Sequence, residues 1–278
     1  MTYQTSSQAH EFTFTHESLQ QRRTDAYQSA VENFTISMSQ TDHLRYVNYY
    51  CTKLLEASRK INFNRYQRYT ALALMQRVYI DKTIWEIPPP LAMISCLFLV
   101  SKFIRPETLD NLLARLGFGQ DFYDKFKPES QMAKVEIGVL TALNFKLKIY
   151  LPFHQVIAIC DNQPFNEKCE EAQQLLFDIL QTDALLLYPP AQIALAAVSK
   201  VVGEKDAFDA IQNINIPEGV DLKENINDIL SLKKISMTEE EVKKFEESLG
   251  PEFAVFHIIS RERQNEKKND KPSAMLPP

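Results

Sequence analysis

The chain has 278 residues, of which 45% are hydrophobic and 24% charged, and its formal net charge is −5. This composition indicates a globular protein that is long enough for two cores of ordinary domain size. The negative net charge argues against direct nucleic-acid binding, which draws its affinity from lysines and arginines placed against phosphates. No apolar stretch reaches the roughly 20 residues that span a bilayer, and the polar start lacks a signal peptide, so we expect an intracellular protein without membrane contact.

No motif in the sequence predicts catalysis or a cofactor. The four cysteines, which show no CxxC spacing, are expected to be reduced thiols rather than zinc ligands or disulfides. With only six glycines, a phosphate-binding loop is disfavoured, and the five histidines are scattered singly. We therefore assign no catalytic residue, no metal and no cofactor, and predict that the chain is not an enzyme.

Helical periodicity dominates the first half of the chain. The helices expected there span about residues 15–34, 42–61, 65–80, 89–103, 107–116 and 128–143. Thr15 and Asn64 are suitable N-caps, Thr41 or Asp42 could cap the helix between them, and Gly117 is suited to close a helix at its C-terminal end.

The second half repeats the arrangement. The helical patterns there cover about residues 152–160, 166–187, 190–202, 207–214 and 222–234, and a further helix is expected from Thr238 to Leu249. The predicted fold is all-α, with two tandem five-helix bundles flanked by N- and C-terminal helices. The predicted domains are an N-terminal segment and helix (1–40), a first bundle (41–150), a second bundle (151–236), and a C-terminal helix with a flexible tail (237–278).

Two apolar helices that each follow a Pro-Pro pair indicate a duplication. Pro89-Pro90 and Pro189-Pro190 lie 100 residues apart, and each pair precedes an apolar run that contains Ser-Lys. Proline is tolerated in the first helical turn, and a helix that is apolar on nearly every side belongs at the centre of a bundle. In the first copy the run ends on Lys102, while another apolar helix contains Glu136. From the residues alone, a salt bridge between two helices would explain this pair.

Several segments, taken together and in order, resemble cyclins. They are YYCTKLLE (49–56), CLFLVSK ending at Lys102, Glu136 followed by Asn144-Phe145, and TDALLLYPPAQIALAAV (182–198). The opening FTFTHESLQQRR resembles the N-terminal helix of the branch that serves the kinase-activating kinase. The resemblance extends to about residue 250 and implies two five-helix cyclin boxes. Leu44 to Val47 depart from the family's substrate-docking motif.

The resemblance also implies a kinase-binding site. In cyclins, a lysine and a glutamate at the positions of Lys102 and Glu136 grip backbone groups of the partner kinase. The apolar part of the same surface would comprise Leu99, Leu140, Phe145, Leu147 and, as a weaker candidate, Phe103. For Leu99 and Leu140, ordinary core packing is the alternative.

The function implied by the resemblance is that of a regulatory subunit that binds and activates a cyclin-dependent kinase. The branch implies the kinase-activating kinase and transcription factor IIH, with phosphorylation of other cyclin-dependent kinases and of the RNA polymerase II C-terminal domain. It also implies nuclear residence, a third assembly subunit and the core of that factor as partners. The alternatives are another transcriptional cyclin, of the Mediator or elongation type, and a B-type general transcription factor, which would be expected to carry basic faces.

Overall fold

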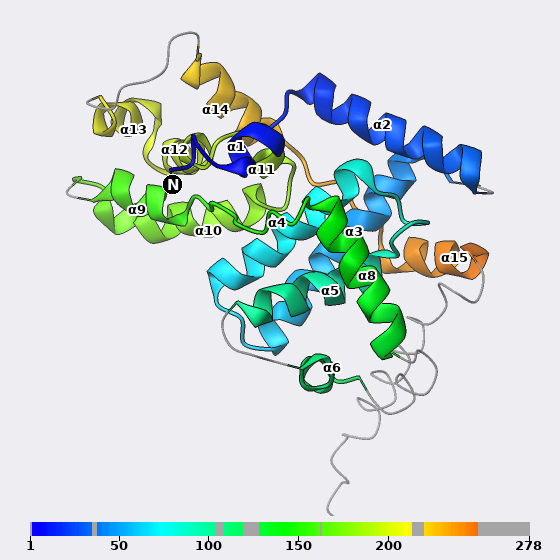
Figure 1. Cartoon of the computed structure of the whole chain (residues 1–278). Helices are drawn as coiled ribbons and strands as arrows, with labels where there is room; N and C mark the ends of the chain where they lie inside the picture. Colours follow the sequence, from blue (N-terminus) through cyan, green and yellow to red (C-terminus); the bar gives the residue numbers. More distant parts are fainter. Residues whose placement is uncertain are drawn as a thin grey trace, which may run out of the picture.

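The computed structural model describes residues 2–34, 38–103, 108–118, 128–161, 163–212 and 220–249. Within these ranges the regular secondary structure is all helical, with no β-strand (Figure 1). None of the helices described there is both long and apolar enough to cross a membrane. The predicted all-α class is therefore confirmed.

The first bundle is built around a central apolar helix. It comprises α3 (Gln40–Lys60), α4 (Arg65–Asp81), α5 (Pro89–Lys102), α6 (Leu109–Leu116) and α8 (Pro128–Ala142). Helix α5 packs against α3, α4 and α8, and every residue from Pro89 to Ser101 is buried. The two prolines occupy its first turn, where a missing N–H leaves no hydrogen bond unmade. The expectation of a central helix is thus confirmed for the first copy.

The second bundle repeats the plan around α12 (Pro190–Val202). Its other elements are α9 (Phe153–Cys160), η1 (Asn166–Lys168), α10 (Cys169–Ile179), α11 (Ala184–Leu187), α13 (Glu204–Ala210) and α14 (Leu222–Ser231). Helix α12 contacts α9, α10, α13 and α14. The two-bundle architecture is confirmed, and the domain boundaries at residues 41–150 and 151–236 remain our proposal.

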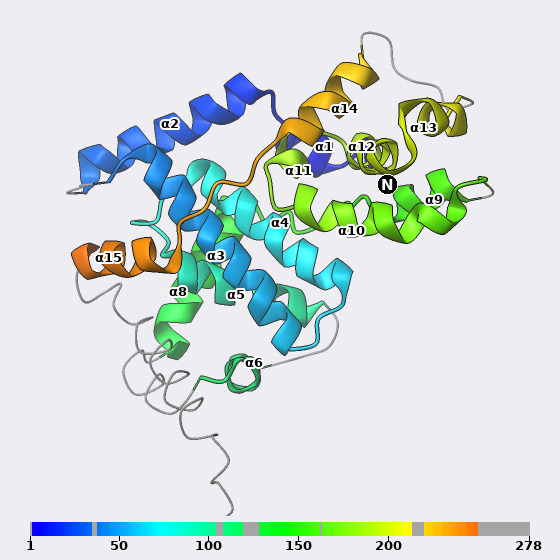
Figure 2. The same cartoon turned by 180° about the vertical axis from the view of Figure 1, so that it is seen from behind.

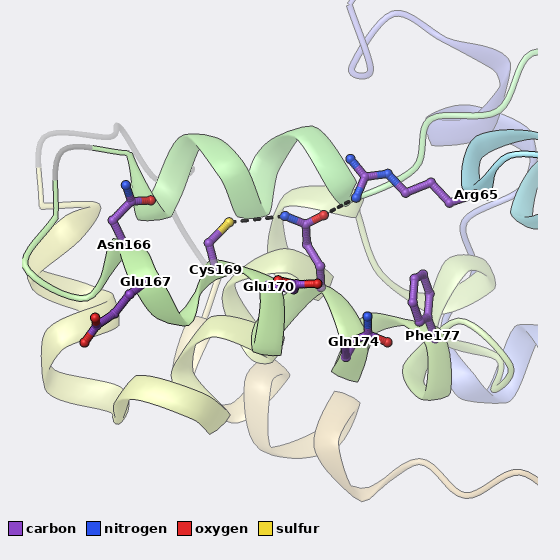
Figure 3. A pocket seen from close by; sticks show the side chains of 8 residues that line it. Arg65, Asn166, Glu167, Cys169, Glu170, Gln174 and Phe177 are labelled. Atoms are coloured by element: carbon purple, nitrogen blue, oxygen red, sulfur yellow. Dashed lines mark hydrogen bonds between the residues drawn. The ribbon is translucent and has the colours of Figure 1, made fainter.

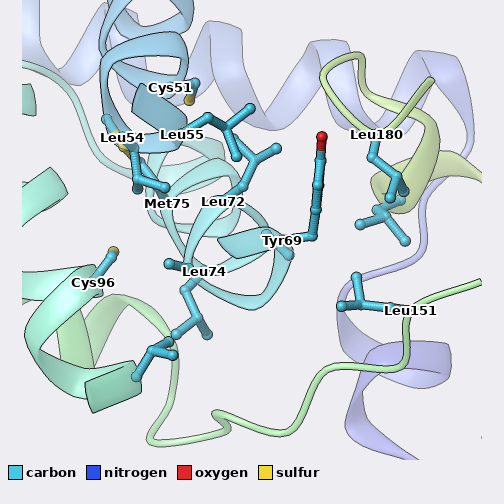
Figure 4. Close-up of a cluster of buried hydrophobic side chains, with 14 of the residues drawn as sticks. Cys51, Leu54, Leu55, Tyr69, Leu72, Leu74, Met75, Cys96, Leu151 and Leu180 are labelled. Carbon is cyan, nitrogen blue, oxygen red and sulfur yellow. The ribbon is translucent and has the colours of Figure 1, made fainter. Parts of the chain in front are cut away.

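The two bundles share one core across α4 (Figure 4). The ring of Tyr69 stacks on Phe177 of α10, with centroids 5.4 Å apart and planes 9° apart. About two turns further along α4, the buried Gln76 side-chain amide donates hydrogen bonds to the carbonyls of Leu180 and Thr182, at 3.2 and 3.0 Å. The interface combines apolar packing with satisfied buried hydrogen bonds. It therefore resembles the interior of a single domain.

The prediction of one long helix at residues 166–187 of the second bundle is wrong. The pattern at residues 166–187 divides into η1, α10 and α11, with a turn after Ile179. The Thr182 hydroxyl donates to the Ile179 carbonyl at 2.6 Å and accepts from the Ala184 N–H at 3.2 Å. Threonine thereby offers the backbone a local alternative to the helix, which periodicity alone does not reveal.

Most predicted caps are confirmed. Thr15 and Asn64 each form a capping box, and Gly117 closes α6 in the left-handed region with φ 84°. The cap of α3 was predicted at Thr41 or Asp42 and is Ser39, whose side chain accepts from the Asp42 N–H. Several serine, threonine and aspartate residues lie at this entry, so composition could not select among them.

The terminal elements pack on the bundles. They are α1 (Ser7–Glu11), α2 (His16–Asn33) and α15 (Glu239–Leu249). Helix α2 is joined to both bundles by the ion pairs Arg22–Asp81 and Arg23–Asp183 and by a hydrogen bond between His16 and Asp228. The chain after α14 crosses to the first bundle and places α15 beside α3 (Figure 2), where the Met237 N–H donates to the Arg45 carbonyl at 3.2 Å. The short α1 was not expected from the sequence, and the predicted tail lies outside the described residues.

Candidate functional site

Helices α5 and α8 bring Lys102 and Glu136 into contact. The Lys102 ammonium lies 2.5 Å from Glu136 Oε1 and 4.0 Å from the centroid of the Phe98 ring. The Lys102 side chain is 40% exposed and the Glu136 side chain 21% exposed. The pair is therefore formed within the chain but remains open to a partner.

The position of Lys102 follows from the character of α5. It is the last residue of the helix and the only one that is not buried. A lysine can lie along apolar surface with its methylene stem while its ammonium reaches solvent, and a cation is favoured at the C-terminal end of a helix. Glu136 comes from α8, which packs directly on α5. The packing of these two helices therefore determines the ion pair.

The chemistry of the pair suits recognition of a polypeptide backbone. An ammonium offers three donors, of which the Glu136 carboxylate uses one, and a carboxylate can accept several hydrogen bonds. Side by side, the two groups could bind a carbonyl and an N–H of a partner at once. Hydrogen bonds to charged groups are also shorter and stronger than those between neutral groups.

The apolar candidates differ sharply in exposure. Phe103 is 57% exposed and Phe145 67% exposed, whereas Leu140 and Leu147 are half-buried and Leu99 is only 4% exposed. Leu99 is thus part of the core of the described chain, and its role as a partner contact remains a prediction. The two exposed phenylalanines are the side chains of this set that a partner could cover most completely.

Sequence reasoning missed Ile137, which is 62% exposed next to Glu136. A signal was present, because a residue directly after Glu136 must lie about 100° around the helix from it and cannot share its contact with α5. The apolar character of α8 obscured this, since all its aliphatic residues could have been core. Ile137 is therefore added to the candidate surface.

The backbone that carries Phe145 is unusual. Helix α8 ends with Asn144 and Phe145 in the left-handed region, at φ 49° and 57°. The Phe145 N–H donates to the Leu140 carbonyl at 2.9 Å, and the Lys146 N–H donates to the Leu143 carbonyl at 2.9 Å. Asparagine tolerates this conformation, but for a bulky residue such as Phe145 it costs of order 1 kcal/mol or more, and such strain often occurs at functional positions.

A polar depression lies elsewhere, between the start of α4 and α10 (Figure 3). It has a volume of about 450 Å³, and its side chains include Arg65, Cys169, Glu170 and Gln173. The Arg65 guanidinium donates to the Gln173 amide oxygen, and the Gln173 amide donates to Cys169 Sγ at 3.2 Å. These groups are engaged with one another and form no nucleophile–base arrangement. Within the described ranges, no group of three or more metal-ligating side chains occurs.

Residues 14–148 match the cyclin N-terminal domain. Among curated proteins, the chain is 28% identical to cyclin-C1-1 of Arabidopsis thaliana over 165 residues, which cover 56% of this chain and 63% of that protein. It is 25% identical to cyclin-H1-1 of the same plant over 181 residues, covering 60% of this chain and 52% of that protein. The chain thus spans less than two thirds of the length of these relatives.

Two solved structures share the fold. A chain of the CAK complex from Chaetomium thermophilum superposes with a TM-score of 0.68 and 19% identity, over 99% of this chain and 97% of that one. A chain of the yeast TFIIK complex superposes with a TM-score of 0.66 and 20% identity, over 83% of this chain and 99% of that one. Residues 14–148 therefore carry a cyclin N-terminal domain, and the chain is similar to proteins named cyclin-H and cyclin-C, while the two solved structures show that it shares their fold.

Proposed function

We propose that this chain is the regulatory subunit of a cyclin-dependent kinase and that it binds and activates that kinase. The observation that carries the proposal is the partly exposed Lys102–Glu136 ion pair at the junction of α5 and α8. Exposed Phe103, Ile137 and Phe145 supply the apolar surface that a lasting protein interface requires. Such an interface would bury on the order of 2,000 Å² in total or more.

The proposed mechanism is activation by positioning. A protein kinase transfers phosphate only when its β3 lysine pairs with the glutamate of helix αC and its activation loop is ordered. A subunit that binds only this arrangement shifts the kinase toward it, and the difference in affinity between the two kinase states is the activating free energy. On this proposal the chain contributes no group to the chemical step.

We further propose that the partner is the kinase-activating kinase. Support comes from the homology to cyclin-H1-1 and from the fold shared with chains of CAK and TFIIK complexes. The complex would phosphorylate other cyclin-dependent kinases and, within transcription factor IIH, the C-terminal domain of RNA polymerase II. A third assembly subunit, the core of that factor and a nuclear location belong to the same proposal.

A second transcriptional kinase is the alternative partner. Cyclin-C1-1 and a putative cyclin-H of Dictyostelium discoideum are both 28% identical to this chain, so a cyclin of the Mediator type is as compatible with the relatives as the first candidate. Both types would use the same surface of α5 and α8, so the identity of the bound kinase distinguishes them. The B-type general factor gains no support from these relatives.

The experiment is affinity purification of the tagged chain from its own cells, with the recovered kinase identified by mass spectrometry and reconstituted for titration. Lys102→Ala and Glu136→Ala are compared with the wild type. Each should weaken binding by about 30-fold or more, because the remaining charge would be buried unpaired in the complex. Lys200→Ala is the matched control, since Lys200 is the exposed lysine of the equivalent Ser-Lys in α12.

Recovery of a kinase that phosphorylates activation loops would support the first partner, and recovery of a Mediator kinase would support the alternative. A kinase that bound both variants as tightly as the wild type would refute the site. Recovery of no cyclin-dependent kinase by the wild-type chain would refute the proposed function.

A further inference from the structure

The N-terminal segment, residues 3–14, lies against the connection between α8 and α9, residues 143–152. Gln8 is completely buried, and its amide makes two hydrogen bonds to one residue of the connection. Its Nε2 donates to the Tyr150 carbonyl at 3.1 Å, and its Oε1 accepts from the Tyr150 N–H at 2.8 Å. A side chain that satisfies both backbone groups of a residue restricts that residue as a neighbouring β-strand would.

Two further contacts join the same segments. Glu11 forms an ion pair with Lys146, which directly follows Phe145. The ring of Tyr3 meets that of Tyr150 edge to face, with centroids 5.9 Å apart. The N-terminal segment therefore contacts the connection at both ends of residues 146–150.

The N-terminal segment is itself anchored away from the connection. Phe12 is 5% exposed and packs in a small cluster with Leu19, Ile80, Leu186 and Leu187. Its ring also covers the buried Arg77 guanidinium at 4.3 Å. The Phe14 N–H donates to the Leu186 carbonyl at 2.8 Å. Contacts with α4 of the first bundle and α11 of the second give the segment a fixed position from which to hold the connection.

The start of the connection has an unusual backbone conformation that contacts from other segments could stabilise. Asn144 and Phe145 are both left-handed, a conformation that asparagine tolerates but that a bulky residue such as phenylalanine rarely adopts. The Phe145 side chain is 67% exposed, so its own packing does little to hold the turn. Beyond the hydrogen bonds that end α8, Leu147 and Ile149 pack against the main core, and Glu11 and Gln8 of the N-terminal segment contact Lys146 and Tyr150.

We propose that Gln8 and Glu11 are positioning residues that hold the connection in the conformation that presents Phe145 to the kinase. The inference rests on the proposed function, because it gives the N-terminal segment a part in kinase affinity without contact to the kinase. It predicts that changes in the N-terminal segment alter kinase binding through the backbone of residues 144–146.

The first test is Gln8→Met, which keeps the length of the side chain and removes both hydrogen bonds. Amide hydrogen exchange is measured on the free chain at Asn144, Phe145 and Lys146, none of which bonds to Gln8. We expect exchange there to be about 10-fold faster, and the dissociation constant for the reconstituted kinase to rise about 10-fold.

The second test exchanges the charges of the ion pair. Glu11→Lys and Lys146→Glu should each raise the dissociation constant about 3- to 10-fold, and the double variant should restore it to within about twofold of the wild type. Glu32→Lys is the matched control, because Glu32 is an exposed glutamate on α2 with the same change of charge. The surface location of this pair keeps the test valid if Gln8→Met folds poorly.

The outcomes separate the two proposals. Faster exchange with weaker binding, and rescue by the charge swap, would support the inference. Unchanged exchange at residues 144–146, or unchanged affinity despite faster exchange, would overturn it, as would a double variant that binds no better than the singles. If the wild-type chain bound no kinase, the proposed function would fall, while the exchange measurement would still decide whether the N-terminal segment restrains the turn.

Discussion

His43 is a buried residue whose neutral form suits the fold. Its ring stacks on Trp85 with centroids 5.7 Å apart, and its Nε2 accepts from the Ile84 N–H at 3.1 Å. Burial, reinforced by the charge of Arg23, lowers the pKa of His43 from 6.5 to about 4. Protonation would place a charge in an apolar site and remove the acceptor of the Ile84 bond.

This pKa predicts loss of stability in mild acid. Between pH 6.5 and 4 the unfolded chain binds a proton at His43 that the folded chain does not. The contribution of neutral His43 to the free energy of unfolding is therefore complete above about pH 6.5 and is lost as the pH falls toward 4. From pH 7 to 5 the loss amounts to about 2 kcal/mol. His43→Gln, which retains an acceptor and cannot titrate, should lose less over this range in urea unfolding. Parallel profiles for the two proteins would contradict the assignment.

At the proposed kinase-binding surface, the sequence indicated which residues to consider, and the structure showed which of them are exposed. The resemblance to cyclins selected Lys102 and Glu136, and the structure places them in contact. Exposure was beyond the sequence, since Leu99 and Phe103 are equally apolar and only packing decides that one is buried and the other open. Ile137 was missed because every aliphatic residue of α8 could have been part of the core.

Among the elements, α15 covers the face of α3 that carries Tyr46 and Tyr50. The hydroxyls of Tyr46 and Tyr50 donate to the buried Glu246 carboxyl at 2.9 and 2.6 Å. Burial raises the pKa of both tyrosines, so both hydroxyls remain protonated donors. The departure from the substrate-docking motif therefore coincides with a face that the chain closes with its own helix.

Glu246→Leu should accordingly release α15. The change leaves two buried hydroxyls without this acceptor, which we expect to lower the unfolding free energy by about 2–4 kcal/mol. Glu246→Gln retains an acceptor oxygen and should lose roughly half as much. Urea unfolding measures both, and equal losses for the two variants would show that the hydrogen bonds are not what holds the helix.

The end of α8 allows binding to be separated from stability. Phe145→Ala and Phe145→Gly both remove the exposed ring, and we expect both to weaken kinase binding equally. Because glycine adopts φ 57° without strain, the glycine variant should be more stable than the alanine variant by up to about 1 kcal/mol. Kinase titration and thermal unfolding test the two effects, and an alanine variant as stable as the glycine variant would argue against a strained turn.

Element positions were largely predictable, because amphipathic periodicity and caps such as Asn64 are local properties. The division of residues 166–187 was not, since it depends on the Thr182 hydroxyl and on the Gln76 amide of a distant helix. The short helix α1 was not predicted, for a related reason. Its Gln8 is buried only because Tyr150 supplies partners for its amide.

For the whole molecule, the shared core predicts cooperative unfolding of both bundles. Tyr69 of α4 stacks on Phe177 of α10, so Tyr69→Ala would open a cavity between the bundles and lower stability by about 3 kcal/mol or more. Scanning calorimetry should show one transition in both proteins, shifted downward in the variant. Two separate transitions, with only one displaced, would mean that the bundles are independent.

Periodicity, prolines at helix starts and ordered motifs lie in neighbouring residues, so the helices, the duplication and the resemblance to cyclins could be found without coordinates. Which apolar side chains remain exposed, where the terminal segments dock, and how the bundles join at α4 became known only from the three-dimensional fold. Those properties depend on contacts between residues far apart in the chain, such as Gln8 with Tyr150 and Tyr46 with Glu246. Their energies arise from burial and from hydrogen bonds that no local pattern specifies.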